Sequence, residues 1–600
     1  MRYKYTGKLK KVTHRTKVYH CLAFDTETYV INDGKGNVTF PLRLGVAIYY
    51  IVGTDNQITS KEVNRFSTQR EFITILKSYM SKDYKLHLFA HNVGFDIRVL
   101  DLLKYFNTNL WLSEPPVING RLFIWSLTDH GKDIVFLDTA NYGVQSIAQL
   151  GKDLRHDKGS VDFDNVSDEQ LYIYCERDVE LVMMFTTEFI KFCNVNKLGD
   201  LQVSLASQSL YSFRARFLYK DIELHNNKRV LALERAAYHG GRVECFRIGE
   251  LPKTNYYYLD INSMYPYIME NYELPCELIG FQEDIPISNL RGRLNRYYAI
   301  ADVSLNTRYN AYPYIYNNLL VFPIGRFRTV LHNEELRYAL DNGDITKIHS
   351  CAVYEKDILF DKYVKFFYKV KQQATRDGNV SWRLISKLFM NSLYGKFGQS
   401  GVERKIIGKL PNNETWRVTA HDQTKGERFQ EIAWNGVVYR EIKAGEAYLS
   451  SPALAGAITA NARMYLYELI TKAGAENVVY TDTDSIIVNE AGHENVKDLL
   501  DELKLGMLKV EHESTNVSIF NCKDYVFGDI SKTKGIPTKA ERISKDVWQF
   551  LQFEGFLAWL SGEMDKGATG KISRRTRRST YQKGYTDPSG YISPYNLMAD

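Results

Sequence analysis

Carboxylates set inside strand-forming apolar runs constrain this sequence more than any other feature. CLAFDTET carries Asp25 and Glu27 two positions apart, and VVYTDTDSIIV carries Asp482 and Asp484 at the same spacing. Side chains two positions apart on a strand face the same side, so Asp25 and Glu27 are expected to lie together. Acids within core-forming sequence need cations or other partners, because their charge is costly to remove from water. The sequence therefore predicts strands that present paired carboxylates to a charged partner.

Length and composition are those of a large globular protein. The 600 residues suggest about four domains, and 44% apolar and 25% charged residues are average values. The sequence has no apolar run of 18 residues and no hydrophobic segment behind its basic N-terminus, so we expect neither membrane insertion nor secretion. Seven scattered cysteines without a C-x-x-C pair argue against disulfides and structural zinc, and favour a reducing cytoplasm.

The net charge of +6 is a mild excess that does not by itself identify a nucleic-acid binder. Basic residues cluster within residues 8–17 and 574–578, and a pair of solvated basic tails is one interpretation. The 42 tyrosines and 30 phenylalanines offer flat faces on which bases could stack. Nucleic acid is therefore favoured only if the candidate catalytic residues agree.

Residue periodicity predicts mixed α/β structure over residues 18–185, with strands at the apolar runs. A helix is predicted from Ser167 to about Phe192, opened by a capping box between Ser167 and Gln170. The later predictions are a helix over 203–237, a turn-rich segment beyond 270, a long helix over about 362–394, polar strands over 396–445, a helix over about 452–473 and a β-hairpin over 478–488.

Two further motifs add to the first pair of acids. HNVGFD places Asp96 at a strand-to-helix edge, and YCERD places Tyr174 and Asp178 four residues apart on one helical face. Four converging acids repel one another unless divalent cations neutralise them, which is what two-metal hydrolysis of a phosphodiester requires. Tyr174 would then orient the attacking water. Each motif alone is more often a solvated surface feature, but their order and apolar flanks together favour a site.

Asp260, at the end of the β-prone run YYYLDINSMYP, adds a third carboxylate to the hairpin acids. Rigid strands that present carboxylates to two magnesium ions are the support that phosphoryl transfer needs, because the chemistry is mostly positioning. Tyr265 follows in the same motif, where it could stack beneath a deoxyribose and exclude a 2′-hydroxyl. A core aromatic is the alternative interpretation of this tyrosine.

KLFMNSLYGKFGQ places Lys387, Asn391 and Tyr394 at i, i+4 and i+7, on one stripe of a helix, and Arg383 extends this stripe by a turn. The two cations are expected to grip triphosphate oxygens, while Asn391 and Tyr394 line the base and sugar. An amphipathic helix with a wet polar face is the alternative.

The motifs of both groups resemble those of a known family. DTET, HNVGFD and YCERD resemble the proofreading 3′–5′ exonuclease of DNA polymerases, and DINSMYP, KLFMNSLYG and YTDTDS resemble the A, B and C motifs of family B DNA polymerases. The resemblance implies an α/β multidomain fold, in which an RNase H-like 3′–5′ exonuclease domain precedes a right-hand polymerase of palm, fingers and thumb. It also implies a DNA-dependent DNA polymerase with proofreading, which acts on primer-template DNA and deoxynucleoside triphosphates through two Mg²⁺ ions per site, with Mn²⁺ as the alternative metal.

Three features resemble the protein-primed, phi-29-like bacteriophage and linear-plasmid group of this family. The first acid falls as early as residue 25, the spacers from Asp260 to Lys387 and from Tyr394 to Asp482 are long, and YHGG stands between the two groups of motifs. This group carries two inserted subdomains. It implies strand displacement, a terminal protein as primer, replication of a linear viral or plasmid genome, and a monomer that acts inside the host cell.

The resemblance assigns roles residue by residue. In the exonuclease, the metal ligands are Asp25, Glu27, Asp96 and Asp178. Tyr174 and Lys158 assist the reaction, and Thr28, Asn92 and Phe95 bind the single-stranded primer end. In the polymerase, Asp260, Ile261 and Asp484 are the metal ligands, with Asp482 as a further catalytic acid. The nucleotide contacts are Tyr265, Arg383, Lys387, Asn391 and Tyr394, and the DNA contacts are Tyr238, Gly240, Gly241, Lys523 and Tyr525.

The implied organisation follows chain order. We expect an exonuclease domain (1–200), a linker and first part of the palm (201–274), a first terminal-protein-region insertion (275–360), fingers (361–396), a second such insertion (397–446), palm (447–530), and a thumb with C-terminal tail (531–600).

Two other functions remain open. One is a primer-dependent family B polymerase without terminal-protein priming, and the insert lengths argue only moderately against it. The other is a non-catalytic DNA-binding replication factor, which predicts missing acids. GATGKIS lacks the spacing of a phosphate-binding loop, and a reverse transcriptase would not explain the exonuclease motifs.

Overall fold

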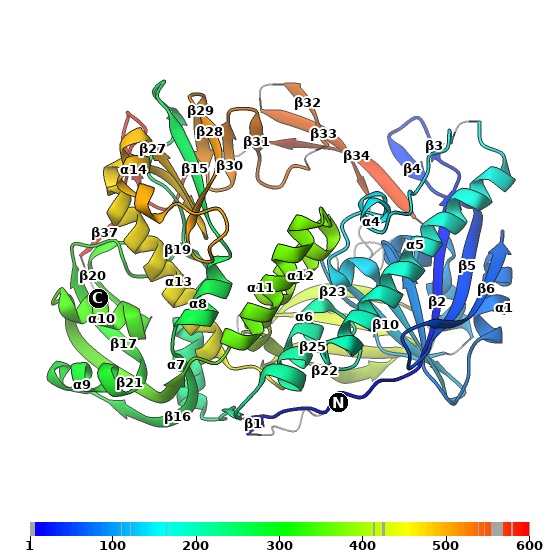
Figure 1. The fold of residues 1–600 in the computed structure, drawn as a ribbon, viewed down its shortest axis with the longest axis horizontal. Helices are drawn as coiled ribbons and strands as arrows, with labels where there is room; N and C mark the ends of the chain where they lie inside the picture. Colours follow the sequence, from blue (N-terminus) through cyan, green and yellow to red (C-terminus); the bar gives the residue numbers. More distant parts are fainter. Residues whose placement is uncertain are drawn as a thin grey trace.

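The computed structural model describes residues 7–109, 111–120, 122–163, 165–411, 414–422, 427–537, 539–544, 546–553, 568–577 and 580–598. An N-terminal α/β unit lies on one side and a second α/β unit on the other, with a pair of long helices between them (Figure 1). Among the described helices, none is long and apolar enough to cross a membrane. Arg578, in the C-terminal basic cluster, lies outside the described residues.

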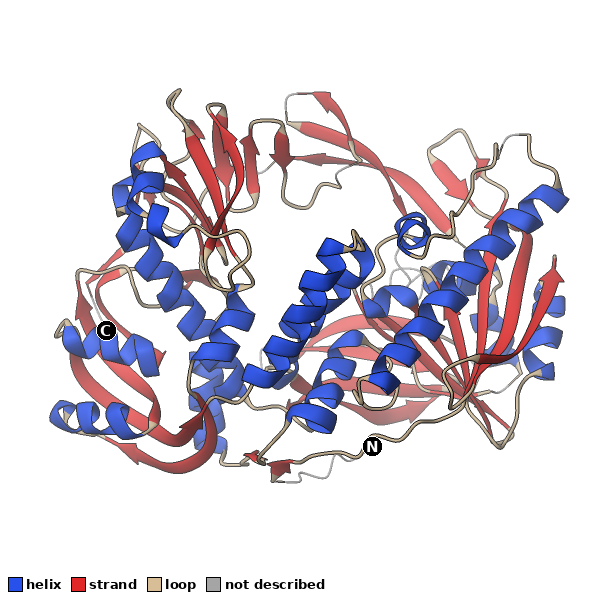
Figure 2. Cartoon of the chain, viewed as in Figure 1, coloured by secondary structure: helices blue, strands red, loops and turns tan. Residues whose placement is uncertain are grey.

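An eight-stranded mixed sheet forms the N-terminal unit (Figure 2). Its order is β6-β5-β2-β7-β11-β10-β8, with β9 paired to β10. β2 runs antiparallel to β5 and parallel to β7, so the strands predicted from the apolar runs are confirmed. The strands are β2 (Tyr19–Thr28), β5 (Leu42–Val52), β6 (Ile58–Phe66), β7 (Leu86–Ala90), β8 (Leu112–Ser113), β9 (Val117–Asn119), β10 (Leu122–Asp129) and β11 (Lys132–Asp138).

The two faces of β2 belong to two different cores. Cys21 and Ala23 pack in the cluster that includes α5 (Asp168–Val195), whereas Leu22 and Phe24 pack with α1 (Gln69–Ser78), α2 (Val93–Val99) and α3 (Leu102–Thr108). This alternation is the period of a strand. α5 begins at the predicted capping box, with Ser167 and Gln170 bonded reciprocally. Residues of β2 therefore face α5 or α2 according to their parity.

A five-stranded sheet of order β13-β26-β27-β15-β28 forms the centre of the second unit. The predicted hairpin is confirmed as β26 and β27, and β27 pairs with β15. The predicted helix over 452–473 is also confirmed, as α13 (Pro452–Ala473). The strands are β13 (Val243–Cys245), β15 (Tyr256–Ile261), β26 (Val478–Asp482), β27 (Ser485–Asn489) and β28 (Leu508–Ser514), and α8 (Met264–Asn271) follows β15.

Two helical predictions were wrong in their continuity. The expected helix over 362–394 is a pair, α11 (Asp361–Arg376) and α12 (Val380–Phe397), because Gly378 takes a φ of +67° and Asn379 caps the second helix. The expected helix over 203–237 is interrupted between its two ends. It consists of α6 (Leu205–Ser212), a π-helical turn (Phe213–Phe217), β12 (Ile222–Glu223) and α7 (Lys228–Ala237).

The turn-rich prediction beyond residue 270 was also wrong. The segment folds into a sheet of order β16-β21-β17-β20-β37, because runs such as β17 have one wholly apolar face along most of their length and are buried almost throughout. The strands are β16 (Leu274–Glu283), β17 (Tyr298–Thr307), β20 (Ile324–His332), β21 (Ile345–Asp357) and β37 (Asn596–Met598), with helices α9 (Leu290–Arg296) and α10 (Asn333–Asp341).

The predicted polar strands form a separate four-stranded sheet of order β22-β25-β24-β23. Trp434 of this sheet is buried against Trp125 of β10, with ring centroids 5.8 Å apart, and its Nε1 donates to the Ser113 hydroxyl at 2.7 Å. The sheet is thereby fixed to the N-terminal unit. Its strands are β22 (Ser400–Lys409), β23 (Trp416–Asp422), β24 (Glu427–Trp434) and β25 (Val437–Glu446).

The C-terminal segment returns to the N-terminal unit. β34 (Thr569–Thr576) pairs with β33 (Val547–Phe553) on one side and with β4 (Asn37–Thr39) on the other. The five-stranded sheet β3-β4-β34-β33-β32 bridges the two units across the top of the view in Figure 1. Its other strands are β3 (Ile31–Asn32) and β32 (Glu541–Ser544), while β29 (Val517–Asn521), β30 (Asp524–Phe527) and β31 (Ile530–Lys532) form a sheet beside the central one.

Candidate active sites

The structure brings the first group of predicted acids into one pocket. Asp25 and Glu27 enter from β2, Asp96 from α2, and Asp178 from α5. The pocket is also lined by four more of the predicted residues, which are Asn92, Phe95, Lys158 and Tyr174.

Lys158 places a cation beside these acids. Its Nζ lies 2.5 Å from Asp178 Oδ2 and 4.9 Å from the centre of the Tyr174 ring. The other oxygen, Asp178 Oδ1, is buried and has no hydrogen-bond partner within the described part of the chain. Because a buried carboxylate oxygen is costly to leave unpaired, this atom is placed to receive a further ligand.

Several carboxyl groups of this pocket have raised pKa values. Burial raises the pKa of Asp25 well above its ordinary value, and the nearby charges of Asp96, Asp178 and Glu27 raise it further. Burial also raises the pKa of Glu27 to about 7, with Asp178 adding to the effect, and that of Asp96 to about 8. Acids that repel one another in this way are the donor set that divalent cations neutralise.

Cys175 is a neighbour that the sequence did not indicate. A ligand atom of each of Asp25, Glu27 and Cys175 lies within 4.8 Å of the others. Burial raises the pKa of the Cys175 thiol, and its Sγ lies 3.5 Å from the Asp25 carbonyl oxygen, which it reaches as a donor. A protonated thiol is a poor metal ligand, so the oxygens of Asp25 and Glu27 are the ligands that fit Mg²⁺ or Mn²⁺.

Other aromatic and polar side chains surround the acids. Phe95 packs on Phe40 with ring centroids 5.7 Å apart, and Asn92 is exposed at a φ of 65° where α2 begins. Thr28 is half-buried at the end of β2. Phe163, which the sequence analysis did not select, is 55% exposed and meets the Tyr174 ring edge to face at 5.7 Å. Its signal in the sequence was an aromatic residue in a mostly polar loop.

The second group of acids meets at one edge of the central sheet. Asp260 lies opposite Ser485 in the β15–β27 ladder, and the Ile261 N–H donates to the Asp484 carbonyl oxygen at 2.7 Å. Burial raises the pKa of Asp260 to about 7, and the Asp484 charge raises it further while Lys387 lowers it. Burial also raises the pKa of Asp484. Asp260 and Asp484 are therefore a mutually repelling oxygen pair, a donor set that fits hard divalent cations.

Asp482 is engaged differently. Its Oδ1 lies 3.4 Å from Lys523 Nζ, and its Oδ2 accepts from the Tyr480 hydroxyl at 3.4 Å. Lys523 adopts a φ of 60° and remains half exposed. Tyr525 is only 2% exposed, with its ring against those of Tyr480 and Tyr258, so Lys523 is the member of this pair that reaches solvent.

α12 presents the predicted nucleotide contacts. Arg383 and Lys387 are exposed on it, and Asn391 Oδ1 is buried without a hydrogen-bond partner in the described part of the chain. Tyr394 packs on Tyr265, with ring centroids 4.6 Å apart. The two tyrosines form a wall between α12 and α8.

Lys371 is a third cation that the sequence analysis missed. It lies on α11, where its Nζ bonds the Ser263 hydroxyl at 2.9 Å. Burial lowers the pKa of Lys371 to about 8, with the Lys387 and Arg383 charges adding to the effect. Three cations thus converge on the Asp260 edge, as expected for a site that binds several phosphates. Lys371 was missed because the predicted single helix hid the pairing of α11 with α12.

The YHGG segment packs against the turn that carries the hairpin acids. A Cβ on Gly241 would approach Thr483 Cγ2 to 2.6 Å, and the Thr483 N–H donates to the Arg242 carbonyl oxygen at 2.7 Å. Gly241 therefore permits the close approach of this segment to the turn between Asp482 and Asp484. Tyr238 covers Gly398 at the end of α12, and Gly240 is exposed.

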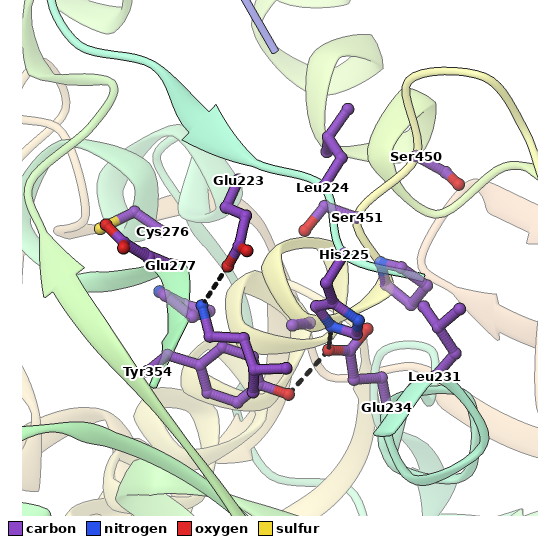
Figure 3. Close-up of a pocket in the computed structure, with 14 residues that line it drawn as sticks. Glu223, Leu224, His225, Leu231, Glu234, Cys276, Glu277, Tyr354, Ser450 and Ser451 are labelled. Atoms are coloured by element: carbon purple, nitrogen blue, oxygen red, sulfur yellow. Dashed lines mark hydrogen bonds and ion pairs between the residues drawn. The ribbon is translucent and has the colours of Figure 1, made fainter. Parts of the chain in front are cut away.

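A further pocket lies near α7, where hydrogen bonds join several helices and strands (Figure 3). Glu234 Oε1 is bonded by both His225 Nε2 and the Tyr354 hydroxyl at 2.7 Å. Glu223 Oε2 accepts from the Leu278 N–H at 2.7 Å. These bonds join β12, α7, β16 and β21, and so brace the helix that leads into Tyr238.

Comparison with solved structures defines the class of fold. Phi29 DNA polymerase complexed with primer-template DNA and incoming nucleotide superposes with a TM-score of 0.65, covering 94% of this chain and 100% of that one at 16% identity. The fold is therefore the one predicted, with an RNase H-like exonuclease domain followed by a right-hand polymerase that carries inserted subdomains. The first pocket lies in the N-terminal unit, and the Asp260 edge lies in the central sheet of the second unit.

The sequence comparison then gives the family. The family described as DNA polymerase type B, organellar and viral, matches residues 145–472, and this chain belongs to it. A probable DNA polymerase of Podospora anserina is 26% identical over 463 residues, covering 70% of this chain and 36% of the relative. The DNA-directed DNA polymerase of Enterobacteria phage PRD1 is 23% identical over 526 residues, covering 82% and 81%. The chain thus spans about a third of the length of the fungal relative.

The raised pKa values predict that divalent metal stabilises the protein more at pH 8 than at pH 5. A carboxyl whose pKa is raised by folding stabilises the fold fully below its unfolded pKa, and that contribution is lost as pH rises through the folded value. For Glu27, Asp96 and Asp260 the folded values are about 7, 8 and 7, so the loss falls between about pH 4 and 8. Saturating Mg²⁺ should raise the melting temperature by about 4 °C at pH 8 and by about 1 °C at pH 5, measured by calorimetry against EDTA. Equal increases in melting temperature at both pH values would contradict the view that these carboxylates bind the metal ions.

Proposed function

We propose that this protein is a DNA-dependent DNA polymerase with a 3′–5′ proofreading exonuclease. The observation that carries the proposal is the presence of two separate carboxylate sites, one in the N-terminal domain and one on the central sheet, each with its own cations. A binding factor with a degenerate core is disfavoured, because it predicts missing acids and all seven predicted acids are present.

In the polymerase site, Asp260 and Asp484 would hold two Mg²⁺ ions, with the Ile261 backbone beside them. Bound Mg²⁺ supplies Lewis-acid activation of the primer 3′-hydroxyl and stabilises charge on the leaving pyrophosphate. Lys371, Arg383 and Lys387 orient the triphosphate. Asn391 and Tyr394 line the nucleotide, and the half-exposed Lys523 steadies the primer terminus.

In the exonuclease site, Asp25, Glu27, Asp96 and Asp178 would hold the metal ions. Lys158 neutralises charge that develops on the scissile phosphate, and Tyr174 orients the attacking water. Thr28, Asn92 and Phe95 bind the unpaired 3′-end. The separation of the two sites lets a misincorporated end be degraded without dismantling the polymerase site.

We further propose protein-primed, strand-displacing replication of a linear viral or plasmid genome. The insertions 275–360 and 397–446 support this, since each supplies most or all strands of a separate sheet, and so does the similarity to the phage PRD1 and Phi29 enzymes. The partner would be a terminal protein, and the enzyme would act as a monomer inside the host cell. Primer-dependent synthesis without a terminal protein is the second candidate.

The proposal is tested with a 5′-labelled primer annealed to a longer DNA template. With Mg²⁺ and deoxynucleotides the primer should be extended to the template end, and without deoxynucleotides it should be shortened from its 3′-end. A protein that binds the DNA but changes the primer in neither direction would favour the non-catalytic replication factor.

Tyr265→Val is expected to let ribonucleotides enter the polymerase site. The Tyr265 ring is packed against Tyr394 beside Asp260, where it would collide with a 2′-hydroxyl. Loss of the ring should reduce discrimination against ribonucleotides by about 10- to 100-fold, measured as the ratio of kcat/KM values for dATP and ATP. Tyr265→Phe, which retains the ring, should keep most of the discrimination. An unchanged ratio in the valine variant would refute this role.

A further inference from the structure

Thr26 lies between Asp25 and Glu27 in sequence but on the opposite face of β2. Leu22 and Phe24, which precede it by four and two residues, pack in the core that includes α2. Strand alternation therefore directs Thr26 toward α2, while Asp25 and Glu27 face α5. Asp96, the one acid of the site that α2 contributes, lies on Thr26's side of the strand.

Two hydrogen bonds join Thr26 to Asp96. The Thr26 hydroxyl donates to Asp96 Oδ1 at 2.6 Å, and the Thr26 N–H donates to the same oxygen at 3.1 Å. The two residues are 6% and 2% exposed, so water does not compete for these bonds. Because both bonds end on Oδ1, they fix the plane of the carboxylate and use neither lone pair of Oδ2.

Asp138 supports the same helix from β11, which β7 separates from β2 in the sheet. Its carboxylate accepts from the Asn92 N–H at 3.1 Å and from the Val93 N–H at 3.0 Å, at the start of α2. It also accepts from the Ala140 N–H at 2.8 Å. An acceptor at a helix N-terminus satisfies N–H groups that have no partner within the helix, and so fixes where the helix begins. The position of Asp96 along the pocket is thus set by Asp138, and the orientation of its carboxylate by Thr26.

We propose that Thr26 is a positioning residue of the exonuclease site, which holds Asp96 with Oδ2 directed to a divalent metal ion, while Asp138 fixes the helix that carries it. The inference rests on the proposed exonuclease function. It assigns a role to the residue between the two acids of the Asp-x-Glu motif. A hydroxyl at this position donates a hydrogen bond to Asp96, which an apolar side chain there could not do.

The test compares Thr26→Val, which keeps the shape and the N–H bond but removes the hydroxyl, with Thr26→Ser, which keeps the hydroxyl. Degradation of single-stranded DNA by the full chain should fall in kcat by about 10- to 100-fold in Thr26→Val with KM unchanged, and Thr26→Ser should recover most of it. Primer extension should be unchanged in both. Calorimetric titration with Mn²⁺, in chains that also carry Asp260→Asn and Asp484→Asn, should show about a tenfold weaker Kd for Thr26→Val.

Thr187→Val is the matched control. This buried threonine on α5 donates its hydroxyl to the Met183 carbonyl oxygen at 2.8 Å and does not line the pocket, so its loss removes one buried bond without touching the site. Wild-type rates and Mn²⁺ affinity in Thr26→Val, or an equal loss in Thr187→Val, would overturn the positioning role. A wild-type chain that neither degrades DNA nor binds Mn²⁺ would instead refute the exonuclease function on which the role rests.

Discussion

Asp260→Ala is expected to reduce primer extension by at least about 1,000-fold, because it removes an oxygen ligand from the point where charge develops in nucleotidyl transfer. Asp484 and the nearby Asp482 are not expected to compensate, since Asp482 is already engaged by Lys523 and Asp260 is the acid that β15 contributes to this edge. Degradation of single-stranded DNA should remain within about twofold of wild type, because the exonuclease acids lie in another domain. Extension and degradation rates of the same preparation provide the measurement.

Glu513→Ala is a suitable control, since this exposed acid lies on β28 next to the strand that carries Asp260 and should leave extension intact. The Asp260→Ala chain should also be at least as stable as wild type without metal, because it loses a carboxyl that burial and Asp484 force to hold its proton. Extension at a near wild-type rate would show that Asp260 takes no part in the reaction. Loss of both activities with normal stability would contradict the proposal of two separate sites.

The double replacement Asp25→Ala with Glu27→Ala should have the opposite effect. It removes two of the four converging acids, so degradation should fall by at least about 1,000-fold while extension continues. Misincorporated ends would then persist, and the error frequency of a copied reporter sequence should rise. The melting temperature in EDTA should increase, because the replacement removes the carboxyl of Asp25, whose pKa is raised by burial and by repulsion from its neighbours.

Asp133→Ala is the control for this pair. Asp133 is an exposed acid on β11 that accepts from the Thr128 hydroxyl at 2.7 Å, outside the pocket, and its loss should alter neither activity. Persistent degradation in the double variant would show that the cluster of acids serves stability or binding rather than hydrolysis.

The carboxylate sites could be predicted because their spacing carries the geometry. Alternation along β2 places Asp25 and Glu27 on one face of the strand, and the four-residue spacing on α5 places Tyr174 and Asp178 on one face of the helix. The hairpin acids were predicted for the same local reason, since apolar runs on both sides of a short turn leave few alternatives. Side-chain periodicity thus placed four of the residues that line the first pocket, whereas Asn92, Phe95 and Lys158 came from the family resemblance.

Contacts between distant segments could not be predicted in this way. Lys371 reaches the site only because Gly378 folds α11 back on α12, and Thr26 bonds Asp96 only because α2 packs on the far face of β2. The C-terminal strand β34 completes a sheet with residues 37–39, more than 500 positions earlier in the chain. Such pairings depend on tertiary packing, which residue propensity does not encode.

The most direct test of the central claim is extension of a labelled primer on a closed single-stranded DNA circle with Mg²⁺, sampled with and without deoxynucleotides. The account predicts products longer than one circle when nucleotides are present, since synthesis would continue by displacing the strand already made, and a shortened primer when they are absent. Arrest after one lap would contradict strand displacement and favour the primer-dependent alternative. A primer that is neither extended nor shortened, in a protein that is folded and bound to the circle, would contradict the assignment of both sites.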